Sequence, residues 1–146
     1  MKTLKALIVL ALLPIQFAAA KSTHKQDDGM FTRTHAIDTY IDAVTRGRLQ
    51  GFDDVLDSSV KFTMLISKNR LKSCDKKEML NFLNKLGHVD ENCTTSTAII
   101  QTTPDMVVAR VDMRFETFIR SNYVSIANTH KGWKIINVYS VFNQLQ

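Results

Sequence analysis

The feature that most constrains the fold is a set of four segments in the second half of the chain, all rich in Thr, Val, Ile and aromatic residues. The segments cover residues 93–103, 106–117, 118–129 and 132–142. These residue types favour β-strands. Pro104-Asp105 and His130-Lys131-Gly132 separate two of the pairs, so we expect antiparallel neighbours joined by tight turns. A chain with four such strands needs a sheet as its main layer.

Alternation along two of these segments predicts which side chains face the core. In residues 106–117 apolar and charged residues alternate, with Val107, Ala109, Val111, Met113 and Phe115 on one side and Arg110, Asp112, Arg114 and Glu116 on the other. Side chains of a strand point alternately to opposite faces, so one face of the sheet is buried. In the last segment the alternate positions are Trp133, Ile135, Asn137, Tyr139 and Val141. We expect these five to share a face.

Helical patterns and a further strand precede the sheet. Residues 35–46 have apolar residues at helical spacing, with Thr34 as the expected cap and Gly47 as the end. A short helical segment at 49–56, an alternating strand at 60–66 and a turn with a possible short strand at 68–73 follow. Asp75 and Glu78 form the pattern of a capping box, which predicts a helix that ends at Gly87. The order of elements predicts an α+β fold, with N-terminal helices packed on a strongly curved, mostly antiparallel sheet.

Three stretches resemble the nuclear transport factor 2-like superfamily, the cone-shaped fold of SnoaL-like and ketosteroid-isomerase-like proteins. They are residues 36–41 with Gly47, the helix entry at 73–86, and residues 123–126 leading into 131–137. The last stretch, Lys-Gly-Trp-Lys-Ile-Ile-Asn, is similar to an ending common in a lumazine-binding-like group of bacterial proteins. The resemblance covers residues 34–143. It implies the fold and a homodimer through the sheet face, but this fold hosts enzymes, adaptors and binding proteins alike.

The first twenty residues have the pattern of a secretory signal peptide. Lys2 and Lys5 precede an apolar run at 6–17, and Ala18-Ala19-Ala20 supplies the small residues of a cleavage site. The run is shorter than the roughly 20 residues of a transmembrane helix. We therefore expect residues 1–20 to be removed, leaving a periplasmic or secreted protein with no membrane attachment.

The basic excess shrinks once the signal peptide is set aside. The chain has 19 Lys and Arg against 14 Asp and Glu, a net charge of +5. Two lysines belong to the signal peptide, so the mature 126 residues have a net charge of +3, and their basic residues are dispersed. A nucleic-acid interface needs basic residues clustered with aromatic ones, so we expect no nucleic-acid partner. Residues 21–33 are predicted to be a flexible lead-in and residues 34–146 a single domain.

Two cysteines remain, Cys74 and Cys93. An oxidising compartment permits a disulfide between them. It would close a segment of 20 residues, which stabilises a fold by about 3 kcal/mol. The alternative is two partly buried free thiols. Neither cysteine has a neighbouring Cys or His at the spacing of a metal ligand, so no metal site is expected.

The polar residues of the chain predict no catalytic residue. An enzyme that resembles this family would hold an Asp, Glu or His inside the cone, where burial moves its pKa towards neutrality. Asp38 and Asp42 lie opposite the apolar stripe of the first helix. The histidines of the domain lie at element ends or in turns, at His35, His88 and His130. The alternative, an isomerase or dehydratase, requires Asp53 or Asp54 to turn inward.

The remaining interior candidates form a predicted ligand-binding set. They are Tyr40, Tyr123, Trp133, Asn137 and Tyr139. An apolar wall with one amide and one phenol suits a small apolar or aromatic molecule. The alternative is that these side chains fill the core. We therefore expect a non-catalytic small-molecule-binding or interaction domain, with no cofactor, that dimerises through its sheet.

Overall fold

The computed structural model describes residues 32–68 and 70–145. The predicted signal peptide and residues 21–31 of the predicted lead-in lie outside these residues. The helices are α1 (Arg33–Arg46), α2 (Phe52–Val55) and α3 (Lys76–Leu86). The strands are β1 (Leu56–Ser67), β2 (Arg70–Asp75), β3 (Thr94–Thr102), β4 (Met106–Arg114), β5 (Phe118–Thr129) and β6 (Gly132–Gln144). The four predicted C-terminal strands are confirmed by β3 to β6.

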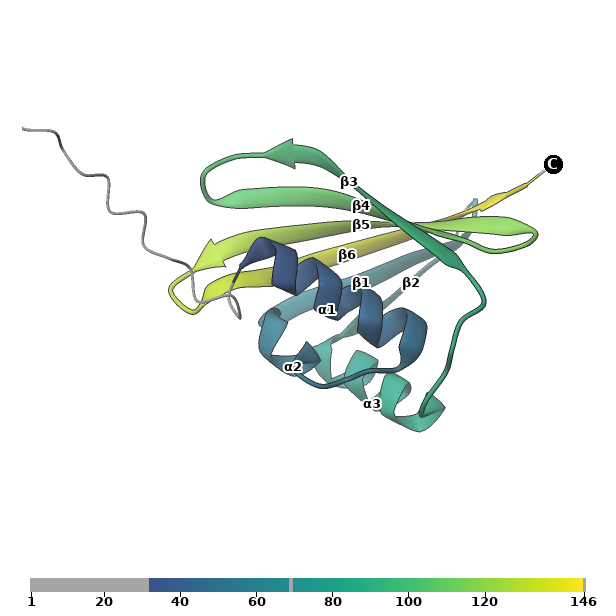
Figure 1. Ribbon diagram of the computed structural model, residues 1–146, viewed down its shortest axis with the longest axis horizontal. Helices are drawn as coiled ribbons and strands as arrows, with labels where there is room; N and C mark the ends of the chain where they lie inside the picture. The colour runs from purple at the N-terminus through teal and green to yellow at the C-terminus, as the bar shows by residue number, and fades with distance from the viewer. Residues whose placement is uncertain (1–31, 69, 146) are drawn as a thin grey trace, which may run out of the picture.

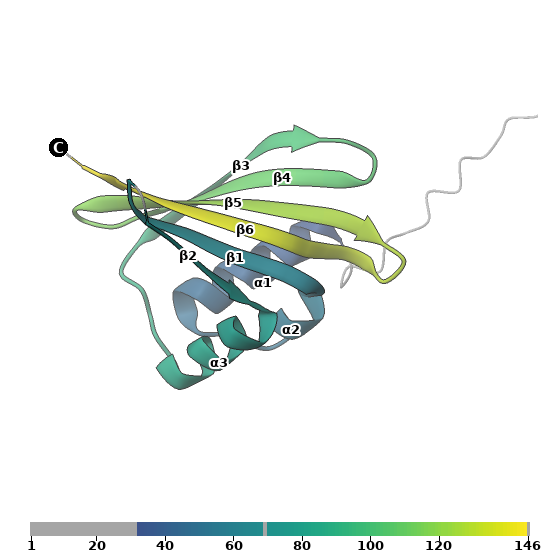
Figure 2. The ribbon, with the colours of Figure 1, turned by 180° about the vertical axis from the view of Figure 1, so that it is seen from behind.

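The strands form a single sheet in the order β2-β1-β6-β5-β4-β3. β1 and β6 are parallel, and all other neighbours are antiparallel. The three helices lie on the same side of the sheet (Figures 1 and 2). α1 packs against β4, β5 and β6, and α3 packs against β1 and β2. The predicted α+β plan, with helices on one face of a curved and mostly antiparallel sheet, is therefore confirmed.

The helix ends are set by local side-chain chemistry. The Thr32 hydroxyl accepts the backbone N–H of His35 at 3.1 Å, so α1 begins at Arg33 and the predicted cap, Thr34, lies inside its first turn. Gly47 ends α1 with a φ of 63°. A Cβ there would lie 2.6 Å from the carbonyl oxygen of Gly87, so the position needs glycine. The capping box of Asp75 and Glu78 is present as predicted.

The core lies between the helices and the sheet face that they cover, which we call the inner face. Along β4 the predicted alternation is confirmed, since Val107, Ala109, Val111 and Met113 are at most 1% exposed. The register places Val124 and Ile126 of β5 beside them on the same face. α2 adds Phe52 and Val55, and it is shorter than predicted because β1 already begins at Leu56.

A β-bulge in β6 overturns the predicted face of the last strand. Ser125 is opposite Asn137 but Ile126 is opposite Ile135, so Ile136 is an extra residue without a partner. Trp133 and Ile135 therefore lie on the inner face. Beyond the bulge the parity reverses, and Asn137, Tyr139 and Val141 lie on the opposite, outer face. The expectation that all five share a face is wrong because a bulge shifts the alternation by one residue.

Candidate functional site

Three of the five predicted ligand-binding residues lie together on the outer face. Tyr123 and Tyr139 are directly opposite each other on β5 and β6, and Asn137 is the next outward residue of β6. All three are half-buried. The neighbouring strand β4 places Arg110 beside Tyr123. The structure therefore brings these residues to the exposed side of the sheet, where they line no interior.

The other two predicted residues belong to the covered side. Tyr40 of α1 is 3% exposed and packs in the core, with its ring centroid 6.4 Å from that of Phe52. Trp133 is half-buried and packs against the same core. Burial raises the pKa of Tyr40 to about 12, although the positive charge of Arg120 lowers it. Tyr40 is consequently a neutral phenol at ordinary pH.

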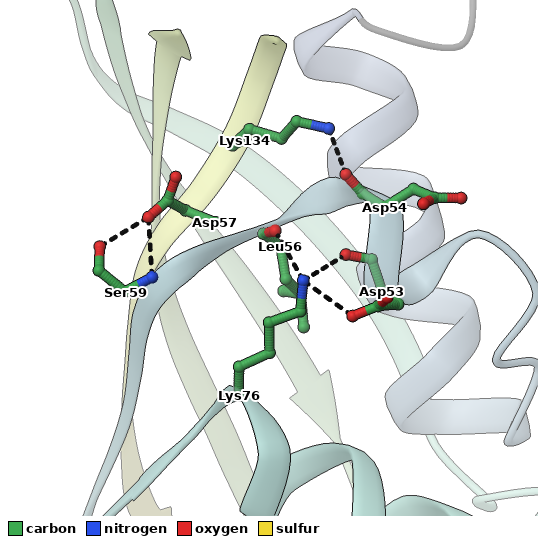
Figure 3. Close-up of polar contacts among 7 residues, drawn as sticks. All are labelled: Asp53, Asp54, Leu56, Asp57, Ser59, Lys76 and Lys134. Carbon is green, nitrogen blue, oxygen red and sulfur yellow. Dashed lines mark hydrogen bonds and ion pairs between the residues drawn. The ribbon is translucent and has the colours of Figure 1, made fainter.

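The carboxylates that an isomerase or dehydratase would need point away from the core. α2 turns Phe52 and Val55 inward and leaves Asp53 and Asp54 exposed. The Lys76 ammonium lies 2.8 Å from the Asp53 carboxylate and donates to the Asp53 and Leu56 carbonyls, at 2.9 and 3.2 Å (Figure 3). These contacts tie the start of α3 to the end of α2. The requirement for an inward Asp53 or Asp54 is not met.

Further hydrogen bonds stabilise the junction between α2 and β1 from the side of the sheet. Lys134 donates to the Asp54 carbonyl, and Asp57 accepts the backbone N–H and the hydroxyl of Ser59 at 2.9 and 2.6 Å (Figure 3). The bonds from Ser59 lower the pKa of Asp57, so this carboxylate stays ionised. An ionised, solvent-exposed carboxylate is a poor general base near neutral pH.

A groove of about 710 Å³ runs beside this junction, between α3 and the start of β1. Its walls are mixed: Val60 and Leu80 lie among polar side chains that include Asp53, Ser59, Lys61, Asp75, Lys76 and Asn81. Lys76 and Asp75 already have partners within the fold, in the junction and the capping box. The groove therefore lies between packed elements, and two of its charged side chains are already bonded within the fold.

A buried polar pair lies on the inner face between β5 and β6. Asn122 is 1% exposed; its amide donates to the Val111 carbonyl at 3.1 Å, and its oxygen accepts the Ser140 hydroxyl at 2.7 Å. A buried amide is tolerated when its hydrogen bonds are made inside the protein. Asn122 thus fills the role of a satisfied core amide that the sequence analysis considered for Asn137.

Beyond Asn122, the inner face ends in a cluster that we call the open end: Phe115, Phe118, Arg120 and Phe142. The ring centroids of Phe115 and Phe118 are 4.5 Å apart and stacked, and those of Phe118 and Phe142 are 5.9 Å apart. Phe142 is 38% exposed, and the other members are half-buried. The β4–β5 turn and the end of β6, which carry these residues, extend beyond α1 (Figure 1). The helices therefore cover the open end less than the rest of the inner face.

Arg120 is the charged member of the open end. Its Nη2 lies 2.8 Å from the Met113 sulfur, and its guanidinium carbon lies 5.9 Å from the Phe115 ring centroid. Its Nε is buried and has no hydrogen-bond partner. A thioether is a weak acceptor, so these neighbours satisfy the guanidinium only in part.

Sequence reasoning missed Arg120, Asn122 and the phenylalanines of the open end. The signal was present in β5, because Val124 and Ile126 are apolar and period-two alternation carries their face back to Asn122, Arg120 and Phe118. The same parity excludes Tyr123 from the inner face.

Cys74 and Cys93 are not bonded to each other in the structure, and each is a partly buried free thiol. Cys74 lies on β2 opposite Phe62, and Cys93 lies immediately before β3. Burial raises the pKa of each thiol. Within residues 32–68 and 70–145 there is no group of three His, Cys, Asp or Glu side chains arranged to hold a metal ion. None of the helices described here is long and apolar enough to cross a membrane.

Comparison with known proteins identifies the fold. The sequence matches no protein-family model and no curated protein sequence. Solved structures do match: an NTF2-like protein of unknown function from Methylobacillus flagellatus has a TM-score of 0.62 and 17% identity, over 84% of this chain and 96% of that one. An NTF-2-like protein of unknown function from Silicibacter pomeroyi has a TM-score of 0.57 and 14% identity, over 77% and 92%.

A third match describes the same architecture in other terms. A cystatin-like fold protein from Burkholderia xenovorans has a TM-score of 0.62 and 10% identity, over 83% of this chain and 96% of that one. At these identities the likeness shows the fold and leaves the activity open. The chain therefore has the predicted α+β cone fold, which it shares with these NTF2-like and cystatin-like structures.

Proposed function

We propose that this nuclear transport factor 2-like domain is a non-catalytic binding domain that holds a small, flat, apolar molecule at its open end. The observation that carries the proposal is the group of three phenylalanines, Phe115, Phe118 and Phe142, which contact one another and remain partly exposed. Aromatic faces in such contact offer a large apolar area with a fixed geometry. The N-terminal signal pattern supports a periplasmic or secreted location for this binding.

The contrast with the rest of the inner face supports the open end as the site. Around Phe52, Ile126 and Ile135 the side chains are fully buried and leave no surface for a ligand. A molecule at the open end would instead cover rings that water now reaches. Burying apolar area contributes roughly 25 cal/mol per Å², which suffices for binding a compact aromatic molecule.

A neutral dye tests this proposal. N-phenyl-1-naphthylamine is flat, uncharged and fluorescent only in apolar surroundings, so its titration reports an apolar site directly. We expect saturable binding to the protein and a loss of affinity of about tenfold in Phe118→Ala, equivalent to about 1.4 kcal/mol. Phe82→Ala, an equally drastic change at an exposed phenylalanine of α3, is the matched control and should bind as the unmodified protein does.

Two results of the dye titration would contradict the proposal. If the dye fails to bind, or if Phe118→Ala and Phe82→Ala bind it equally well, the open end is not an apolar binding site. Thermal unfolding of each variant separates loss of binding from loss of the fold. Native mass spectrometry of protein purified from its own host would show whether a ligand is retained.

We also propose a homodimer through the outer face, which a separate observation favours. Tyr123 and Tyr139 are opposite each other on this face, and beside them Arg110 Nε forms an ion pair with Asp112 Oδ2 at 3.1 Å. Yet Arg110 Nε and Asp112 Oδ1 are buried without a hydrogen-bond partner. Half-buried tyrosines and an imperfectly bonded charge pair are typical of a surface that a second chain covers.

Light scattering during size-exclusion chromatography tests the dimer. The unmodified protein should elute with twice the mass of one chain, and Tyr139→Lys should elute as a monomer because a charge at the centre of the interface has no partner. Lys131→Glu, in the exposed turn before β6, is the control and should leave the mass unchanged. A monomeric unmodified protein would contradict the dimer and leave the open-end proposal unaffected.

A further inference from the structure

We infer that the ligand of the open end is an organic anion, with an acidic group bound by Arg120 and a flat apolar body on the phenylalanines. The inference rests on the proposed function, because it names the chemical class of the molecule at that same site. It goes further because it assigns the recognition of the ligand's negative charge to Arg120.

The position of Arg120 is what links charge to the aromatic surface. The register of β5 places Arg120 opposite Met113 of β4 and Phe142 of β6, so it shares the inner face with both. Its guanidinium lies over the Phe115 ring at 5.9 Å, and that ring stacks on Phe118. A molecule resting on these rings would have the guanidinium at its edge.

Within the described part of the chain, the Arg120 guanidinium forms no ion pair with an acidic side chain. Among residues 32–68 and 70–145, the ion pairs join Asp42 to Arg46 and Arg48, Asp53 to Lys76, and Asp112 to Arg110. Arg120 takes part in none of them. Its guanidinium contacts the Met113 sulfur and the Phe115 ring, and its Nε is buried without an acceptor.

This environment favours an incoming anion on physical grounds. A partly desolvated guanidinium that lacks an anionic partner is costly, and a sulfur atom and a ring face offset that cost only in part. A carboxylate can accept two parallel N–H donors from a guanidinium, and such charge-assisted bonds are the strongest hydrogen bonds in proteins. Because the surrounding side chains are apolar, the anion is held more firmly than it would be on a wet surface.

The reach of this charge is visible in its neighbours. Arg120 lowers the pKa of Tyr40 and of Cys93, although burial outweighs it in both cases. Tyr40 is on α1 and Cys93 is in the segment before β3. The field of the guanidinium therefore reaches α1 and the segment before β3, where the Glu91 carboxylate acts on the Cys93 thiol in the opposite direction.

A matched pair of dyes tests the inference. 1-anilinonaphthalene-8-sulfonate has the aromatic body of N-phenyl-1-naphthylamine with a sulfonate added, so the two differ by one permanent negative charge. We expect the unmodified protein to bind the anionic dye at least tenfold more tightly than the neutral dye. In Arg120→Gln this preference should be lost, while affinity for the neutral dye stays within twofold.

Two further variants keep the result interpretable. Arg120→Met keeps an unbranched, apolar stem in place of the aliphatic part of arginine, so it should repeat the loss of preference if the glutamine variant folds poorly. Arg114→Gln removes a charge of the same kind from an exposed position on β4, and it should leave both affinities unchanged. Thermal unfolding of all variants verifies the fold.

The possible results separate the two proposals. If neither dye binds, both the proposed function and this inference fail. If the neutral dye binds and the anionic dye binds no more tightly, the apolar site stands and the inference is wrong. If Arg120→Gln and Arg120→Met lose both dyes equally, Arg120 supports the shape of the site and does not recognise charge, which also overturns the inference.

Discussion

The covered end and the open end of the inner face are built from the same strands and differ in what lies on them. At the covered end, Ile126 of β5 and Ile135 of β6 are fully buried beneath the helices. At the open end, Arg120 and Phe142 of the same two strands are partly exposed. Asn122 and Ser140 lie between the two ends and bond to each other. The comparison shows that a continuous pair of strands can supply stability at one end and a surface for binding at the other.

The largest expected effect is a difference in stability between the two ends. Phe52→Ala should lower the free energy of unfolding by about 3–5 kcal/mol, because the ring is 0% exposed and its loss leaves a cavity. Phe118→Ala should cost about 1 kcal/mol, since a half-buried ring leaves no closed cavity. Urea unfolding of both variants measures this. Equal losses of stability would mean that the open end is part of the core and that the two ends do not differ as described.

The second effect concerns Tyr40, which packs near Phe52 of the covered end and is within the electrostatic influence of Arg120 at the open end. Burial raises its pKa from 10.0 to about 12, so folding favours the neutral phenol. The resulting stability is complete below pH 10 and is lost as the pH rises through the folded-state pKa. For two pKa units the loss amounts to about 3 kcal/mol. Tyr40→Phe should lack this component.

The measurement is the free energy of unfolding in urea from about pH 9 to about pH 12, compared between the unmodified protein and Tyr40→Phe, so that other titrating groups cancel. Tyr139→Phe, at a half-buried position of the outer face, is the control. A stability difference between the unmodified protein and Tyr40→Phe that stays constant across this range would show that Tyr40 is not desolvated by the core.

The third effect tests the boundary between the two ends. Asn122→Ala should destabilise the fold by about 2 kcal/mol, because the Val111 carbonyl and the Ser140 hydroxyl lose a buried partner. Ser140→Ala should cost about 1 kcal/mol, and the double variant less than the sum of the two, by about 1 kcal/mol. If the two losses are strictly additive, the hydrogen bond between Asn122 and Ser140 contributes nothing to stability, and the two ends are not joined by it.

Features of this fold that depend on neighbouring residues can be predicted from the sequence, whereas features that depend on distant strands cannot. The strands, α3 with its capping box, and the buried side of β4 follow from local patterns, since propensity, caps and alternation act within a few residues. The bulge at Ile136 does not, because an extra residue is defined by what lies opposite it in β5. A single unpaired residue was enough to move Asn137 and Tyr139 to the outer face.

The candidate site was harder to predict for the same reason. Arg120 is a candidate because it has no acidic partner among residues 32–68 and 70–145 and because it lies over the ring of Phe115, which follows β4; neither is a property of its own segment. Likewise, the sequence alone does not say whether Asp53 and Asp54 turn inward, as an isomerase or dehydratase would require. Their role depends on Lys76, which lies 23 residues after Asp53 and binds it from another helix. Long-range partners decide the chemistry of each group.

The smallest expected effect concerns Cys93, a thiol that reports the charge of the open end. Arg120 lowers the pKa of this thiol, although burial raises it overall. Arg120→Gln should therefore raise the pKa further and slow the reaction of the thiol with a disulfide reagent near pH 8, because only the thiolate reacts. At the distances and screening of a partly buried site we expect a change on the order of twofold.

The measurement needs one reactive thiol, so it is made in a Cys74→Ser background with Ellman's reagent. Arg114→Gln, which removes an exposed charge from β4, should leave the rate unchanged. Raising the salt concentration should shrink the difference between Arg120→Gln and its parent, since exposed charges are screened more strongly than buried ones. A rate that is insensitive to Arg120 would place the guanidinium away from Cys93 and would confine its charge to the aromatic rings beside it.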